Sequence, residues 1–186
     1  MNVKKISADY ALSIIKEMIG AHWVGISRPV EAFFLSFETD IDDKTVGYAL
    51  HTQTSYRIYK GNKILQAFYD IYTPNSKTDM TNFDRGDLKW SVSGASLRDE
   101  ITKRDIEPII TQFVIKDIDI TKYGDLTIYF TNDYILEFFI NHSYLNEESE
   151  SYRYFISSDG VNLTPHIVVY SNGIELHGGE DDNKRV

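Results

Sequence analysis

The sequence predicts an α+β protein built mainly from antiparallel sheet, or a partly open barrel, with an N-terminal helix and a short middle helix. Runs rich in aromatic and β-branched residues dominate the chain, and this composition is typical of strands. Turn signals such as Gly61 with Asn62 and Asn172 with Gly173 separate several of these runs. Because helices do not alternate regularly with strands, a parallel doubly wound sheet is disfavoured.

Apolar residues at helical spacing over residues 8–19 predict one amphipathic helix. Ser7 is placed to cap its N-terminus, and Gly20 is placed to end it. A shorter helix is predicted over residues 97–104, and Pro108 marks either a second turn of helix or the end of the first.

The remaining regular structure is predicted to be strand. The runs cover residues 23–27, 32–38, 46–59, 63–72, 112–120, 125–131, 134–141, 152–157 and 166–170. Residues 73–93 are polar, contain proline and glycine, and predict a long surface loop of the kind that is often functional or mobile. We expect one α+β domain over residues 1–178 and a flexible acidic tail over residues 179–186.

Composition excludes several classes of protein. The chain has 186 residues and no cysteine, so disulfides, thiolate nucleophiles and cysteine metal sites are absent. The formal net charge of −9 disfavours nucleic-acid binding, which needs clustered lysine and arginine. The N-terminus lacks a signal-peptide pattern and the apolar runs are too short to cross a bilayer, so we expect a cytoplasmic protein without a membrane partner.

The hairpin around Gly61 and Asn62 predicts a candidate ligand-binding surface. A two-residue turn there pairs Tyr56 with Ala67 and Arg57 with Gln66. On this register one face carries an acid/base group, an amide, a cation, a carboxylate and a phenol: His51, Gln53, Arg57, Asp70 and Tyr72. Such a set can recognise a small polar ligand, with the 73–93 loop as its lid. The alternative is an ordinary solvated sheet face with cross-strand hydrogen bonds only.

No complete catalytic, metal or cofactor motif occurs. The five histidines lack the spacing of a metal site, the glycines form no phosphate loop, and no serine lies in a nucleophile elbow. We therefore predict no catalytic residue, no metal and no cofactor. The acidic residues Glu147, Glu148 and Glu150 are candidates for docking a basic partner by electrostatic steering, and the alternative is a solvated loop.

Four segments carry a family resemblance. They are LHTQTSYRI at residues 50–58, KILQAFYDIYTP at 63–74, LTIYFTNDYILEFF at 126–139 and ESYRYF at 150–155. The pattern resembles a family of small uncharacterised bacterial α+β proteins and is similar in part to bacterial immunity-type proteins. The resemblance implies an intracellular protein that interacts with a partner, and it implies no chemistry and no established site.

Three functions follow as expectations. The first is a non-enzymatic binding protein that contacts another protein through an acidic surface, for example to neutralise a toxin or effector. The second is a small-ligand binding protein or an undescribed enzyme that uses the polar hairpin face. The third is a homodimer that buries an exposed aromatic sheet face.

Overall fold

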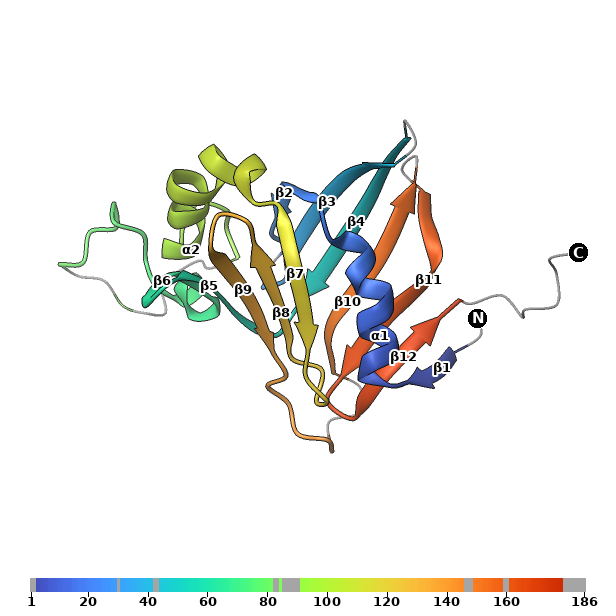
Figure 1. Ribbon diagram of the computed structural model, residues 1–186. Helices are drawn as coiled ribbons and strands as arrows, with labels where there is room; N and C mark the ends of the chain where they lie inside the picture. Colours follow the sequence, from blue (N-terminus) through green and yellow to red (C-terminus); the bar gives the residue numbers. More distant parts are fainter. Residues whose placement is uncertain are drawn as a thin grey trace, which may run out of the picture.

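The computed structural model describes residues 3–29, 31–41, 44–81, 84, 91–145, 149–158 and 161–178. Over these residues the chain forms two helical segments and two antiparallel sheets that do not close into a barrel (Figure 1). The predicted α+β class, with its mainly antiparallel sheet and its N-terminal and middle helices, is therefore confirmed. The predicted tail over residues 179–186 lies outside the described residues.

The larger sheet has seven strands, in the order β1 (Val3–Ile6), β12 (Gly173–His177), β11 (Val161–Tyr170), β10 (Glu150–Ser158), β4 (Lys44–Thr52), β3 (Phe33–Ile41) and β2 (His22–Ser27). The smaller sheet has five, in the order β6 (Lys63–Ala67), β5 (Ser55–Lys60), β9 (Tyr134–Phe139), β8 (Leu126–Phe130) and β7 (Ile115–Ile120). The strand predicted over residues 46–59 is thus two strands, and the chain changes sheet between them. The strand predicted over residues 63–72 ends at Ala67 and continues as the 3₁₀ helix η2 (Phe68–Tyr72).

The first helix begins at its predicted cap, and the second helix has a serine cap of its own. In α1 (Ala8–Ile15) the hydroxyl of Ser7 accepts a hydrogen bond from the backbone N–H of Tyr10 at 3.2 Å, and the 3₁₀ turn η1 (Lys16–Met18) extends the helix. In α2 (Leu97–Ile101) Ser96 and Asp99 cap each other. A π turn, η4 (Thr102–Ile106), and a 3₁₀ turn, η5 (Glu107–Gln112), continue α2.

The core lies between the two sheets. Side chains from the inner faces of both sheets and from α1 form one buried cluster, in which Ile15 of α1, Trp23 of β2 and Phe138 of β9 are fully buried. Along one side, backbone hydrogen bonds join the two sheets. Trp23 N donates to Phe113 O, and Ile115 N donates to Ala21 O, both at 2.9 Å. Figure 1 shows α1 lying against the seven-stranded sheet beside β7.

No helix among the described residues is both long enough and apolar enough to cross a membrane.

Candidate functional site

The predicted register of the β5–β6 hairpin is wrong beyond its turn. Lys60 pairs with Lys63 across Gly61 and Asn62, as predicted. A β-bulge then shifts the register by one residue, so that Ile58 faces Gln66. Gln66, which was predicted to oppose Arg57 on a polar face, is consequently fully buried.

The five predicted ligand-binding residues therefore do not share one face. They lie on four different elements: His51 on β4, Gln53 in the crossover between the sheets, Arg57 on β5, and Asp70 and Tyr72 on η2. Each described interaction ties the side chain to a neighbour outside the set. Arg57 forms an ion pair with Glu137, for instance, and the Tyr72 hydroxyl donates to Glu31 Oε1 at 2.6 Å.

Tyr72 shows the electrostatic result of this placement. Burial, followed by its hydrogen bond to the carboxylate of Glu31, raises the pKa of Tyr72 to about 12. The phenol is thus protonated at neutral pH and donates its hydrogen bond to Glu31.

The structure instead brings together a row of five rings on the outer face of the seven-stranded sheet. We call it the ring row, and its members are Phe34 on β3, His51 on β4, Phe155 on β10, His166 on β11 and His177 on β12. From β3 to β12 the successive ring centroids are 3.7, 4.9, 5.2 and 5.3 Å apart. Sequence reasoning missed the row because its members come from five strands whose order in the sheet differs from their order in the chain.

Arg153 connects two of the predicted residues that were not expected to meet. It pairs with His51 across β10 and β4, and its guanidinium forms an ion pair with Glu150. The same guanidinium lies 5.7 Å from the ring centroid of Phe155, a cation–π distance. His51 and Glu150 therefore lie on one surface, whereas Glu147 and Glu148 lie outside the described residues.

Burial sets the charge of two histidines in the row. Desolvation lowers the pKa of His51 and of His166 below the ordinary value for histidine. Both imidazoles are consequently neutral at pH 7 and behave as flat aromatic surface.

Carboxylates share the outer sheet face with the ring row. The alternation of side chains places Glu38, Asp40 and Glu175 on this outer face, and a β-bulge between Glu150 and Tyr152 adds Glu150, against the cations Lys5 and Arg153. The face is thus aromatic at its centre and predominantly acidic around it.

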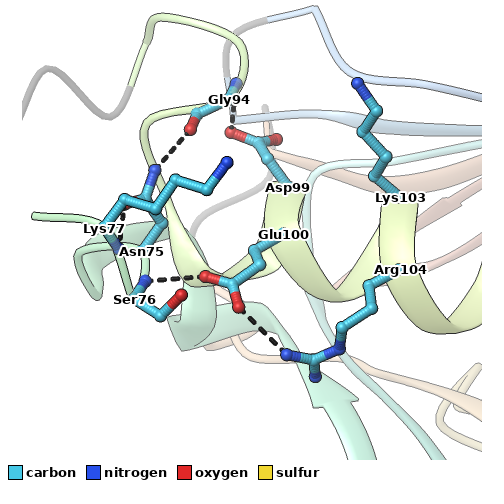
Figure 2. A pocket seen from close by; sticks show the side chains of 8 residues that line it. All are labelled: Asn75, Ser76, Lys77, Gly94, Asp99, Glu100, Lys103 and Arg104. Atoms are coloured by element: carbon cyan, nitrogen blue, oxygen red, sulfur yellow. Dashed lines mark hydrogen bonds and ion pairs between the residues drawn. The ribbon is translucent and has the colours of Figure 1, made fainter.

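A cavity of about 410 Å³ lies elsewhere, between the residues that follow η2 and the helical segment formed by α2 and η4. Eight side chains line it (Figure 2). Lys77 reaches in from the loop, and Lys103 and Arg104 extend from the helical segment on the opposite side. The cavity borders the beginning of the predicted 73–93 loop, and it contains none of the five predicted ligand-binding residues.

Comparisons with protein-family models, with curated proteins and with solved structures found no match. Among the described residues, no group of three or more histidine, aspartate or glutamate side chains is arranged to hold a metal ion. Any functional argument therefore depends on the geometry of the ring row and of the cavity.

Proposed function

We propose that this chain is a non-enzymatic binding protein whose ring row docks a basic surface of another protein. The observation that carries the proposal is the ring row itself, a continuous aromatic strip flanked by carboxylates on an outer sheet face. The sequence resemblance adds an immunity-type role to this proposal, in which the partner is a toxin or effector.

The composition of this face supports docking better than simple solvation. Aromatic side chains and arginine are enriched in the cores of protein interfaces, because they bury a large area and lose little conformational entropy. Phe34, His51 and Phe155 are only half-buried, so their rings retain surface that a partner can cover. The α1 helix and the five-stranded sheet both pack on the inner side, and on the outer side these three rings are the accessible part of the row, because His166 and His177 are buried.

The charge of the face specifies the partner. Carboxylates around an aromatic centre attract a basic surface and repel an acidic one, and the net charge of −9 adds long-range steering. Salt screens exposed charges over about 8 Å at physiological ionic strength, so association should slow as the salt concentration rises.

The test compares two matched substitutions. Phe155→Ser removes a ring from the row, whereas Phe139→Ser removes a half-buried phenylalanine from the outer face of the other sheet. The immobilised wild-type chain and both variants are incubated with bacterial lysate, and captured proteins are quantified and identified by mass spectrometry. We expect a stoichiometric basic partner to be captured by the wild type and by Phe139→Ser, and to be lost with Phe155→Ser.

Two results would contradict the proposal. One is capture of the same partner by Phe155→Ser with unchanged affinity, and the other is a captured partner with an acidic surface. The alternative is that a second copy of the chain covers the ring row, and light scattering tests it. A dimer that dissociates in Phe155→Ser would assign the face to self-association and not to a different protein.

A further inference from the structure

The walls of the cavity beside α2 are fixed by hydrogen bonds. The side-chain amide of Asn75 donates to Gly94 O at 2.7 Å, and its oxygen accepts from the backbone N–H of Lys77 at 3.0 Å. The backbone N–H of Ser76 donates to Glu100 Oε2 at 2.6 Å, which ties the loop to the helix. A ligand entering this cavity would therefore find most of its lining already in place, which lowers the entropic cost of binding.

The two carboxylates that line the cavity both have an arginine partner. Asp99 forms an ion pair with Arg28 at 2.8 Å, and both side chains are largely buried. Glu100 accepts from Arg104 Nη1 at 2.9 Å, and this contact contributes to lowering the pKa of Glu100, after the hydrogen bonds from Ser76. Asp99 is thus balanced by Arg28, whereas Glu100 shares Arg104 with Asp105 and also faces the charge of Lys77.

Two lysine ammonium groups that line the cavity form no ion pair among the described residues. Within the part of the chain that the structure describes, no carboxylate lies within ion-pair distance of Lys77 or Lys103. They approach the cavity from opposite sides, Lys77 from the loop and Lys103 from η4 (Figure 2). The cavity is thus locally positive in a chain whose formal net charge is −9.

We propose that this cavity binds a small phosphate ester that also carries hydroxyl groups. A phosphate monoester has a charge of about −1.5 to −2 at pH 7, which matches two ammonium groups. Lysine binds phosphate as a point charge and needs no fixed geometry. The oxygens of Glu100 and Gly94 keep lone pairs that can accept from ligand hydroxyl groups. The volume of about 410 Å³ lies within the range of small-molecule sites.

The site is independent of the ring row. No residue of the ring row lines the cavity, so neither proposal depends on the other. Solvated surface lysines are the simplest alternative, and they would give no saturable binding.

The experiment is isothermal titration calorimetry with glycerol 3-phosphate as the probe, and with glycerol and inorganic phosphate as comparison ligands. We expect saturable binding of glycerol 3-phosphate, binding of inorganic phosphate that is at least about tenfold weaker, and no binding of glycerol. The double variant Lys77→Ala with Lys103→Ala removes both ammonium groups and should bind the ester at least about tenfold more weakly. A tenfold loss corresponds to about 1.4 kcal/mol of binding free energy.

The matched control is Lys116→Ala with Lys122→Ala, which removes the same charge from exposed positions outside the cavity and should leave binding unchanged. Amide shifts of Ser76 and Gly94 in NMR spectra provide a second readout, because both residues line the cavity. All four cavity and control lysines are exposed, and Gln replacements at Lys77 and Lys103 give a second pair of variants that are uncharged but polar.

Three results would overturn the proposal: no saturable binding, equal affinity in the cavity variant and the control, or equal affinity for inorganic phosphate and the ester. The last would show an adventitious ion only.

Discussion

At the scale of single residues, the least expected side chain is Gln66. It is fully buried, its amide donates to Arg98 O at 2.9 Å and to Thr102 Oγ1 at 2.8 Å, and its oxygen accepts from the Tyr56 hydroxyl at 3.2 Å. One amide therefore satisfies three groups in the core behind α2. The β-bulge in the β5–β6 hairpin is what turns Gln66 inward.

Gln66→Leu should lower the free energy of unfolding by about 1–3 kcal/mol, the cost of leaving a buried polar group without its partner. The measurement is urea denaturation followed by circular dichroism. Gln53→Leu is the matched control, since Gln53 is exposed and its replacement should change stability by less than about 0.5 kcal/mol. Equal losses in the two variants would show that the buried network contributes nothing specific.

The histidines of the ring row predict how stability depends on pH. The folded-state pKa of His51 and of His166 is lowered, so below about pH 6.5 the unfolded chain binds more protons than the folded chain. Stability should consequently fall as the pH falls from about 6.5 to the folded-state pKa values. The charged or titratable groups that face these rings are Glu150, Arg153 and His177.

The pH prediction is tested with the double variant His51→Phe and His166→Phe, which keeps both rings and removes both titrations. Urea midpoints are measured between about pH 5 and pH 7.5, around the ordinary histidine pKa. The variant should lose part of the wild-type slope in this interval, while the slope from carboxylates below it should remain. An identical slope in both proteins would mean that neither histidine has a lowered pKa.

At the scale of elements, the crossover from β4 to β5 decides the architecture. Thr54 is buried there, and its single hydroxyl hydrogen has two acceptors within reach, Phe139 O and Asn141 Oδ1, while its backbone N–H donates to Thr52 Oγ1 at 3.1 Å. The Thr52 hydroxyl in turn donates to Ser151 O. Two threonines therefore satisfy the backbone where the chain leaves one sheet and enters the other.

Thr54→Val keeps the shape of the side chain and removes its hydroxyl. We expect a loss of about 1–3 kcal/mol in the free energy of unfolding, because the replacement leaves a buried acceptor without its donor. Thr127→Val, on the outer face of the five-stranded sheet, should change stability by less than about 0.5 kcal/mol. Chemical denaturation of both variants measures the difference. An unchanged free energy of unfolding in Thr54→Val would show that the hydroxyl of Thr54 does not stabilise the crossover.

Most elements could be predicted because their cause is local. The helix beginning at Ala8 follows from its cap and its period, and the strands from β7 to β10 follow from aromatic and β-branched runs between turns. The strands β1 and β12 were not predicted, because each is short and is held by pairing with a neighbouring strand, β1 by β12 and β12 by both β1 and β11. The division of residues 46–59 into two strands could not be predicted either, since both halves have a sequence typical of strands and only tertiary packing separates them.

The candidate sites lay beyond local reasoning for a related reason. His51 and Glu150 were singled out for different roles, and strand order alone brings them together around Arg153. The cavity depends on a contact between the loop after η2 and α2. These two segments are about twenty residues apart in sequence, and the spacing of apolar residues does not predict such a contact. The five residues expected to share a face are separated because the chain changes sheet after Thr52 and leaves the hairpin after Ala67, and a one-residue bulge also shifts the register between them.

At the scale of the whole molecule, the two sheets share one buried cluster. Ile15 and Met18 from α1 and η1 pack in the same cluster as Trp23 from the larger sheet and Leu136 from the smaller one. The sheets are also linked by backbone hydrogen bonds between the neighbourhoods of β2 and β7. The organisation of residues 1–178 as one domain stays a prediction, and cooperativity of unfolding is its test.

Ile15→Ala should lower the free energy of unfolding by about 2–5 kcal/mol, because Ile15 is fully buried and truncation leaves a cavity. Ile19→Ala is the matched control four residues later, where the side chain is 42% exposed and the loss should be under about 1 kcal/mol. If both sheets depend on the same core, tryptophan fluorescence and far-ultraviolet circular dichroism should report one transition that moves to lower urea in Ile15→Ala. If the two signals separated in this variant, each sheet would unfold as its own unit, and the prediction of one domain over residues 1–178 would be wrong.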